Sequence, residues 1–537
     1  MAKLSGQVDN FLVGSELRSL TQLRDHQNNF LFVEGLADLA ADVKSVLGSG
    51  TKLSYAADWS EYFGYHPQDG SGDVFFHLDR LWGHPAIDAV GIDSYMPLSD
   101  WRDTDNHLDI TQTDNIYDLD YLQSNVLGGE GYDWFYASQA DRDNQIRTPI
   151  SDGLAGDDWV FRYKDIEQWW ANPHYNRVGG IIESTATDWT PQSKPFWITE
   201  LGCPAIDKGA NQPNVFVDPK SSESFFPYFS QGTRDDLIQR RYIEAYLDFW
   251  APEHSRNPSS PIYNGDMIDL SRVSIWTWDA RPFPDFPARS DVWSDGENWQ
   301  LGHWLTGRTG LVPLSDVVDE LVQDAGVTNI DTTRLAGLVE GYVVDRPMTA
   351  RAALEPLSIV YGFNVLERAQ ALSFVSDGFE PIVDLSPMDL IDFSAAEPRI
   401  TRSDMESELL DVRLQFIESA QDYQLGALSA RNRLAETVRV LDLAVPIILS
   451  RPLANFAAET LLAKSIIGRE ALSLSLSPAR IDLEVGDIIR LPDKDELWLL
   501  QEMQGDAAQI NVRAARVEPR LGPVSYTHLT LPTTPYV

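Results

Sequence analysis

Five short apolar runs recur along the first half of the chain, and each leads into a polar or aromatic side chain. They occupy residues 11–13, 52–58, 86–96, 196–198 and 272–279. Short apolar runs that end at Gly, Pro or Asp are typical of buried strands. We therefore predict five strands at these positions.

Helical periodicity fills several of the spaces between these runs. Apolar residues at three- and four-residue steps predict a helix from Phe32 to Val46, which Gly48 ends. Residues 75–82 and 234–250 also have a helical pattern. Strands that alternate with helices predict a parallel sheet or a barrel. An open doubly wound sheet stays an alternative, although no GxGxxG loop follows any strand.

A long segment, residues 98–195, separates the third and fourth predicted strands. It is acidic and aromatic, with Gly-rich turns at residues 128–131 and the pair Trp169 and Trp170. It is longer than a plain crossover, and long inserts of this kind often carry substrate-facing loops. A structural flap or a contact surface for another subunit is an equally weighted alternative.

The composition changes near Leu311, where tryptophan becomes rare and Leu, Ala and Val dominate. Apolar periodicity predicts helices at residues 314–325, 349–361 and 454–463. Alternation predicts a hairpin and further strands, at residues 341–344, 363–367, 372–375 and 479–490, and residues 438–449 are mostly apolar. We predict an α+β domain over residues 311–524.

The last stretch, residues 525–537, contains no Asp, Glu, Lys or Arg and fits neither periodicity. Such a stretch differs in character from the strongly charged chain before it. We treat it as a non-native tail and exclude it from the fold prediction.

Charge and composition exclude several classes of function. The net charge of −39 argues against direct binding of nucleic acid, because phosphate contacts need clustered Lys and Arg. The single cysteine, Cys203, allows no intrachain disulfide, and the nine histidines form no zinc-binding pattern. No metal and no organic cofactor is predicted. For the Asp-rich residues 100–120 a calcium site is the alternative to a solvated acidic loop, and we expect the solvated loop.

The sequence shows no transmembrane segment and no leader peptide. We therefore expect the protein to be made in the cytoplasm.

Acidic and aromatic side chains stand at the carboxyl ends of the predicted strands. In chain order they are Glu16, Trp59, Asp93, Tyr95, Glu200, Trp276 and Trp278. The carboxyl ends of parallel strands meet at one edge, which is where barrel enzymes place their catalytic groups. The alternative for each glutamate is a strand end that merely caps the next loop. An aromatic content of 11% suits a sugar site, but also an ordinary core.

Three of the strand ends resemble a known clan. The sequences GSEL at residues 14–17, WITELG at 197–202 and IWTWDARP at 275–282 are similar to the barrel clan of retaining glycoside hydrolases. More closely, residues 8–310 resemble the glycoside-hydrolase-like barrel of tail hub proteins from gene transfer agents and related tailed phages. That resemblance is carried by the runs YAADWSEY, AIDAVGIDSYMPLSDW, VFRYKDIEQWW, CPAIDKGANQPNVFVDPKSSES and GHWLTGRTG.

The second half resembles the domain that follows the barrel in those hubs. The runs GYVVDRPMTARAALEPL, SAQDYQLGALSAR and LEVGDIIRL are similar to a phage tail (tip-attachment-like) domain. The order of the two domains agrees with the hub proteins. The resemblance therefore implies a (β/α)8-barrel-like domain over residues 1–310, followed by an α+β phage tail hub domain.

The resemblance also implies roles for the residues at the strand ends. In the clan the fourth strand ends in the acid/base glutamate and the seventh in the nucleophile, which correspond to Glu16 and Glu200. One must stay protonated and the other ionised. Tyr95 and Trp276 would border the sugar subsite. We add the neighbouring groups to the predicted substrate-binding set: Ser15, Trp59, Asp93 and Trp278.

Two departures from the clan change the expectation. Ser15 stands where many enzymes of the clan have an asparagine that bonds the sugar 2-hydroxyl, and a serine reaches less far. If residues 11–16 are the fourth strand, the first three strands are absent, because only about ten residues precede it. We therefore expect an N-terminally incomplete barrel-like domain.

The implied function is that of a structural component of a phage-like (gene transfer agent) tail tip or baseplate hub. Its barrel would bind or hydrolyse cell-envelope glycans as the particle enters its host. The implied partners are other tail and baseplate proteins, further copies in a homo-oligomeric ring, and envelope polysaccharide or peptidoglycan. The alternatives are a freestanding retaining glycoside hydrolase with an accessory domain, and an inactive barrel kept for tail architecture. The implied location is an assembled phage-like tail particle.

Overall fold

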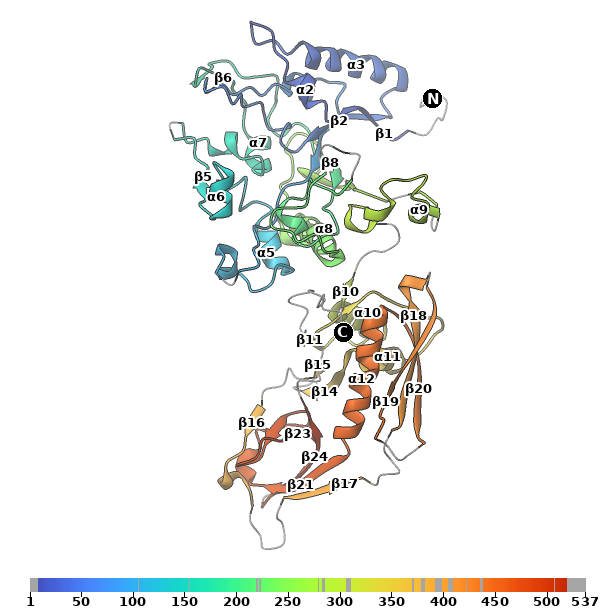
Figure 1. Cartoon of the computed structure of the whole chain (residues 1–537). Helices are drawn as coiled ribbons and strands as arrows, with labels where there is room; N and C mark the ends of the chain where they lie inside the picture. The colour runs from blue at the N-terminus through green and yellow to red at the C-terminus, as the bar shows by residue number, and fades with distance from the viewer. Residues whose placement is uncertain are drawn as a thin grey trace. The chain divides into compact units, whose positions relative to one another are not determined.

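The computed structural model describes residues 8–518, except residues 105, 154, 219–220, 222–223, 279, 283–284, 306–310, 369–370, 378–381, 392–397, 404–408, 422, 435–437 and 507. The predicted non-native tail and Asp279 lie outside the described residues. The chain divides into two compact units, Met1–Gly310 and Leu311–Val537. Each unit is described by itself (Figure 1).

The N-terminal unit is built on one sheet of five strands, all parallel to their neighbours. In sheet order these are β1 (Asn10–Ser15), β2 (Lys52–Asp58), β3 (Val90–Ser94), β8 (Phe196–Leu201) and β9 (Ile268–Ile275). The sheet order is also the chain order, as in a barrel, whereas a doubly wound sheet reverses its order at a switch point. This confirms the predicted parallel sheet. Within the described residues β1 and β9 are its edges, so the sheet is open and no closed barrel forms.

Two long helices of this unit agree closely with the sequence pattern. Helix α3 (Leu31–Leu47) buries Val33, Leu36 and Ala40, and ends at Gly48, whose φ is 85°. A positive φ favours glycine, which explains the stop. Helix α8 (Asp236–Phe249) begins at Asp235, whose carboxylate accepts a hydrogen bond of 3.0 Å from the backbone of Ile238.

The predicted helix over residues 75–82 is wrong for its first half. Only α4 (Asp79–Trp82) is helical. Tyr65 and Phe75 instead form an antiparallel bridge, in which each backbone N–H donates to the carbonyl of the other residue at 2.7–3.0 Å. These contacts satisfy backbone N–H and C=O groups that would otherwise form the hydrogen bonds of a helix. The last strand of the sheet also differs, because β9 begins four residues before the predicted run and ends at Ile275.

One face of the sheet carries the hydrophobic core of the unit. Alternate strand residues pack there against the helices, among them Tyr55, Val90, Ile92, Phe196 and Ile198. Trp169 and Trp170, from α7 (Ile166–Ala171), belong to the same core and are each 1% exposed. This pair is therefore core material. The other face is also buried in the central strands, where Ser54 and Ala56 are 0% and 2% exposed, but it is open at the edge, where Leu12 of β1 is 42% exposed.

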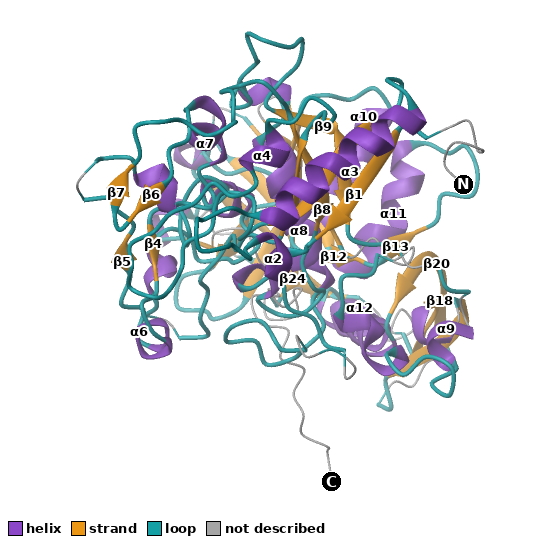
Figure 2. Cartoon of the chain, turned by 90° about the horizontal axis from the view of Figure 1, so that it is seen from above, coloured by secondary structure: helices purple, strands orange, loops and turns teal. Residues whose placement is uncertain are grey.

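The insert after β3 consists mostly of loops, drawn in teal in Figure 2. Its regular elements are short: α5 (Leu119–Ser124), β4 (Trp134–Phe135), α6 (Gln139–Asp143), β5 (Thr148–Pro149), α7, β6 (Arg177–Val178) and β7 (Ile181–Ile182). Apolar side chains of this segment, among them Leu122, Val126 and Val160, join the core of the unit, so packing holds the insert although its helices are short.

The C-terminal unit is α+β. Its main helices are α10 (Leu314–Asp324), α11 (Ala350–Tyr361) and α12 (Arg451–Ile467). A four-stranded sheet has the order β13 (Gly341–Tyr342), β20 (Val440–Leu449), β18 (Asp411–Glu418) and β19 (Gln424–Arg431). A three-stranded sheet has the order β11 (Ile330–Arg334), β15 (Ala371–Ser376) and β14 (Phe363–Arg368). A six-stranded sheet has the order β16 (Ile382–Asp384), β22 (Ile488–Arg490), β23 (Leu497–Gly505), β24 (Ile510–Val517), β21 (Glu470–Leu476) and β17 (Arg399–Arg402).

The sequence pattern predicted the three helices, the hairpin and β13, and one predicted strand is wrong. It gave no prediction for β11, β16, β17, β18, β19, β21, β23 or β24. The hairpin is confirmed as the antiparallel pair β14 and β15, and Thr349 caps α11 by accepting from the backbone of Ala352. The strand predicted over residues 479–490 is wrong, because only β22 is extended. Pro478–Arg480 form a 3-10 turn and Gly486 has a φ of 98°, so the backbone turns twice before the strand begins.

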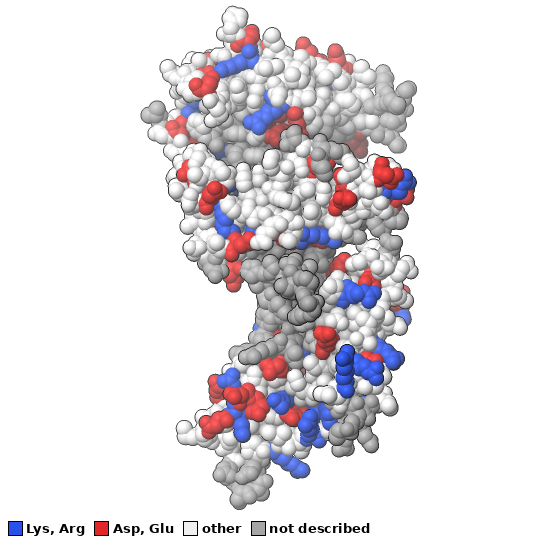
Figure 3. Space-filling view, viewed as in Figure 1, with Lys and Arg blue, Asp and Glu red and all other residues white. Residues whose placement is uncertain are grey.

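Acidic and basic side chains lie beside one another in small groups on the face shown in Figure 3. One ion pair of the N-terminal unit joins Arg24 to Asp73 at 2.9 Å. In the part of the chain that the structure describes, no helix has the length and apolar character needed to cross a bilayer.

Candidate functional site

The predicted site residues lie at or just past the carboxyl ends of the five parallel strands. Ser15 ends β1, Asp93 lies near the end of β3 and Glu200 lies near the end of β8. Glu16 is exposed and Glu200 is half-buried, so solvent reaches the two glutamates, whereas Asp93 is fully buried. The structure therefore places the two predicted catalytic carboxyls at one open edge of the sheet.

Irregular strand pairing changes the direction in which the side chains point at this edge. Between β3 and β8 the register advances from Ile92 opposite Ile198 to Asp93 opposite Glu200, so β8 holds one extra residue, Thr199. A bulge of this kind turns side chains that would otherwise alternate, and bulges are common beside active sites. β1 has a similar shift before Ser15. The sequence carried no signal for either irregularity.

Glu200 is held by Tyr95. The phenol of Tyr95 donates a hydrogen bond of 2.6 Å to Glu200 Oε2. Burial raises the pKa of Glu200, and this hydrogen bond opposes the rise because it stabilises the ionised carboxylate. Burial, and then the charge of Glu200, raise the pKa of Tyr95 far above its usual value, so the phenol keeps its proton. Tyr95 is thus a donor directed at the proposed nucleophile.

Asp93 contacts the neighbouring strand β8 and also the end of β1, which lies beyond β2 in the sheet. Its Oδ1 accepts 2.6 Å from the Thr199 hydroxyl, and its Oδ2 accepts 3.3 Å from the Ser15 hydroxyl. Burial raises the pKa of Asp93 to about 8; the charges of Glu200 and Glu16 add to the rise, while the two hydroxyls oppose it. The Ser15 hydroxyl is therefore directed at a protein carboxyl in this structure.

A second network fixes the loop that carries Glu16. The backbone at Glu16 has a left-handed φ of 51°, which is uncommon for a residue with a side chain. Its N–H donates to the carbonyl of Ala56 at 2.8 Å, and the next N–H, of Leu17, donates to the Tyr55 hydroxyl at 2.7 Å. That hydroxyl lies 3.2 Å from both carboxylate oxygens of Glu61, which is completely buried. The sequence pattern did not single out Tyr55 or Glu61, because an apolar strand run gives no sign of such a contact.

The aromatic residues of the predicted site differ in their exposure. Trp276 and Trp278 are 44% and 64% exposed, so their ring faces are accessible. Trp59 is partly buried and packs edge-on against Tyr163, with ring centroids 4.7 Å apart. Tyr95 packs edge-on against buried His303 at 5.5 Å. Among these four aromatic residues of the predicted site, Trp276 and Trp278 are the most exposed.

Gly202 lets β9 come close to β8 at this edge. A Cβ added to Gly202 would lie 2.4 Å from the carbonyl oxygen of Trp276, well inside contact distance. Gly202→Ala is therefore expected to destabilise the N-terminal unit by about 1–3 kcal/mol and to displace Trp276. Thermal unfolding measures the first effect, and tryptophan fluorescence the second.

The matched control for this substitution is Gly35→Ala in α3, where an added Cβ has nothing within 4 Å. There the change is expected to be neutral or to stabilise by up to about 1 kcal/mol, because alanine favours a helix more than glycine does. If both variants have the same melting temperature, the close approach of the chain at Gly202 does not contribute to stability.

Two of the Asp-rich residues differ from the solvated acidic loop that we expected, whereas Asp103, Asp114 and Asp120 are exposed. Asp100 and Asp109 are each 3% exposed. Arg147 pairs with both carboxylates, and Arg102 pairs with Asp100 at 2.8 Å. The arginines neutralise the carboxylates and allow their burial. Among the described residues, no group of three or more His, Cys, Asp or Glu side chains could hold a metal ion.

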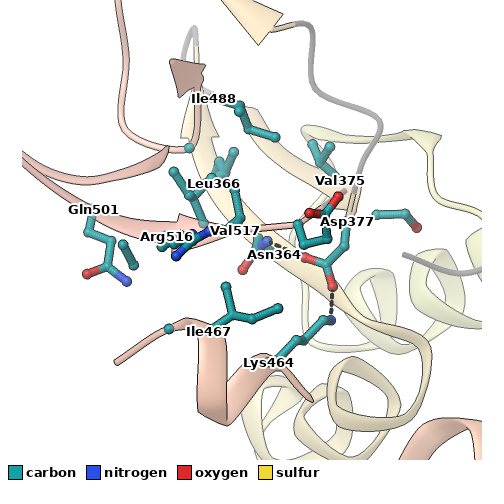
Figure 4. Close-up of a pocket in the computed structure, with 16 residues that line it drawn as sticks. Asn364, Leu366, Val375, Asp377, Lys464, Ile467, Ile488, Gln501, Arg516 and Val517 are labelled. Atoms are coloured by element: carbon teal, nitrogen blue, oxygen red, sulfur yellow. Dashed lines mark hydrogen bonds and ion pairs between the residues drawn. The ribbon is translucent and has the colours of Figure 1, made fainter. Parts of the chain in front are cut away.

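The C-terminal unit has a cavity of about 220 Å³, shown in Figure 4. Apolar side chains from β14, β15, β22 and the end of α12 line it, among them Leu366, Val375, Ile467 and Ile488. At its edge Lys464 is paired with Asp377, which also accepts 3.2 Å from the amide of Asn364. This lining contains no nucleophile and base in contact, so the cavity has no catalytic arrangement.

An open, consecutively ordered parallel sheet with carboxyls at its carboxyl edge defines a TIM-barrel-like α/β protein. The family model for the GTA TIM-barrel-like domain, where GTA is gene transfer agent, matches residues 1–287, and the chain belongs to this family. Residues 349–503 match a second family model, described as "Putative phage tail protein". The two matches confirm the resemblance found in the sequence and identify a tail component of a gene transfer agent or phage-type virion.

Solved structures with similarity to the chain include a chain of a virion particle and a prophage tail protein. A chain in the virion of a native gene transfer agent particle is 34% identical, with 43% of this chain and 53% of that chain covered and a TM-score of 0.38. The present chain thus spans about half the length of that relative. The 43 kDa tail protein of prophage MuSo2 from Shewanella oneidensis is 13% identical, with 39% and 67% covered and a TM-score of 0.28. Comparison with curated protein sequences gives no match.

Proposed function

We propose that the N-terminal unit binds and hydrolyses a cell-envelope glycan by a retaining mechanism as the tail reaches its host. The observation that carries this proposal is the pair formed by Tyr95 and Glu200 at the open edge that also holds Glu16. A carboxylate that is both accessible and fixed by a phenol is suited to attack a sugar carbon.

In this mechanism each group has one task. Glu200 attacks the anomeric carbon in its ionised form, which the Tyr95 hydrogen bond favours. Glu16 gives a proton to the leaving oxygen and later takes one from the water that releases the sugar. The exposed faces of Trp276 and Trp278 stack on the sugar rings. No metal or organic cofactor is required for this chemistry.

The whole chain is proposed to act as a hub of the tail tip or baseplate. Its partners in this role are other tail proteins and further copies of itself arranged in a ring, and its glycan is an envelope polysaccharide or peptidoglycan. The family matches of both units support this assignment. The competing functions are a freestanding hydrolase, and a barrel kept only for architecture.

The deciding experiment exposes purified peptidoglycan and envelope polysaccharide to the intact protein. We expect new reducing ends, whose anomeric configuration by NMR is that of the substrate. Electron microscopy of the same preparation should show rings or tail-like assemblies. Binding to the glycan without new reducing ends contradicts hydrolysis and favours the architectural function, and an active monomer that never assembles contradicts the hub.

A further inference from the structure

One buried carboxyl contacts the residue that precedes each proposed catalytic glutamate. Ser15 precedes Glu16 and Thr199 precedes Glu200, and both hydroxyls donate to Asp93, at 3.3 Å and 2.6 Å. Asp93 itself is completely buried. A side chain without exposed surface cannot reach a sugar hydroxyl, so its contacts with Ser15 and Thr199 define what it does.

We infer that Asp93 is a positioning residue that sets the separation of Glu16 and Glu200. This inference rests on the proposed function, in which those two glutamates act together on a glycan. Through Thr199, Asp93 fixes the bulged part of β8. Through Ser15, it fixes the end of β1.

The link between β1 and β3 is unusual, because these strands are not neighbours in the sheet. β2 lies between them, and its Ala56 is in register with both Ser15 and Gly91. Asp58 is the β2 residue in register with Asp93, so the contact from Ser15 to Asp93 crosses β2 diagonally, past the methyl group of Ala56. The contact therefore joins two strands that no backbone hydrogen bond connects directly.

Side-chain hydrogen bonds of this kind are needed because the backbone at both glutamates is irregular. Thr199 is the extra residue in β8, and Glu16 has a left-handed backbone. Regular strand pairing alone therefore does not fix either side chain, and Asp93 adds to the hydrogen bond of Tyr95 with Glu200 and the backbone bond of Glu16 with Ala56. Retaining hydrolysis requires a defined separation of the two carboxyls.

The ionisation of Asp93 suits this task. Burial raises its pKa to about 8, so at neutral pH the carboxyl is mostly protonated and adds little charge beside the two glutamates. A third fixed negative charge would oppose the ionisation of the nucleophile. Asp93 can therefore position the site while leaving the nucleophile ionised.

The test compares three substitutions, at Asp93 and Thr199, in the full-length protein. Asp93→Ala removes both contacts, and Thr199→Val removes only the contact on the Glu200 side. A misplacement of about 1 Å can cost roughly 10²-fold in rate, so kcat is expected to fall by about that factor while KM changes little. Asp93→Asn should restore kcat to near the wild-type value, because its amide oxygen accepts from Thr199 and its NH2 group donates to Ser15.

Crystal structures of the variants supply a readout that does not depend on hydrolysis. The Glu16 and Glu200 carboxyls should separate or rotate in Asp93→Ala and stay in place in Asp93→Asn. Unmoved glutamates with unchanged kcat in Asp93→Ala overturn the inference. If the wild-type protein cleaves no glycan, the proposed function fails, yet the positions of the glutamates still decide the role of Asp93. If Asp93→Ala does not fold, Thr199→Val and Ser15→Ala decide it.

Discussion

Replacing Glu200 with glutamine is expected to abolish glycan cleavage, with a loss of roughly 10⁴-fold or more in kcat. An amide cannot attack the anomeric carbon, although it keeps the shape of the carboxylate and accepts the Tyr95 hydrogen bond. Glycan binding should therefore persist. Measuring kcat together with the dissociation constant for the same glycan separates the two effects.

Glu16→Gln is expected to differ from Glu200→Gln in a diagnostic way. Loss of a general acid costs about 10²–10⁴-fold when the leaving group needs a proton. An activated aryl glycoside leaves without that proton, so its first step should be largely spared in Glu16→Gln and lost in Glu200→Gln. Burst kinetics with such a substrate tests the assignment of acid and nucleophile.

The pH dependence of cleavage follows from the surroundings of Glu200. Burial raises the pKa of Glu200 above the ordinary value for glutamate, which is about 4.3. Because only the ionised form attacks, activity should be lost as the pH falls through this raised pKa. Tyr95→Phe removes the hydrogen bond that lowers this pKa. The acid limb of its kcat/KM profile should therefore move to higher pH.

The matched control is Glu34→Gln, an exposed position on α3, which should cleave like the wild type. If Glu200→Gln also cleaves like the wild type, Glu200 is not the nucleophile and the proposed mechanism fails. If Glu16→Gln and Glu200→Gln respond alike to every leaving group, the assignment of separate roles is wrong.

The sequence allowed the general plan of the site to be predicted. The apolar runs predicted five parallel strands, and carboxyl ends of parallel strands lie at one edge, so Glu16 and Glu200 could be expected there. These predictions depend only on local periodicity and chain order.

Contacts between distant residues could not be predicted in the same way. The contacts of Asp93 with Ser15 and Thr199 depend on an extra residue in β8 and on a small residue in β2. Nothing in the run around Thr199 distinguishes a bulge from a regular strand. Trp169 and Trp170 show a related limit, because the insert that contains them was expected to carry substrate-facing loops or a flap, and this pair fills the core.

Lys164→Met is expected to cause the largest loss of stability, about 3–5 kcal/mol in the N-terminal unit. Lys164 is completely buried. Its ammonium donates to three backbone carbonyls, those of Pro97 at 2.5 Å, Asn125 at 2.8 Å and Gly128 at 2.9 Å. Methionine has a similar length but no donor, so it leaves the three buried carbonyls unpaired.

The control for Lys164→Met is Lys52→Met, since Lys52 is about half exposed and pairs with Asp88 near the surface. A surface pair contributes about 0–1 kcal/mol, so this variant should melt close to the wild type. Lys164→Met should lower the melting temperature by an amount on the order of 10 °C. Equal melting of the two variants would show that the buried ammonium contributes no more than a surface pair does.

The three carbonyls also connect Lys164 to the proposed site. Pro97 follows Tyr95 by two residues, while Asn125 and Gly128 belong to the insert. Lys164 thus ties the insert to the chain that leaves β3, and its loss should loosen the segment that carries the Glu200 donor. We therefore expect Lys164→Met to lower kcat even at temperatures where the unit stays folded, whereas Lys52→Met should not. Cleavage assays at least about 10 °C below the melting temperature of each variant distinguish this local effect from global unfolding.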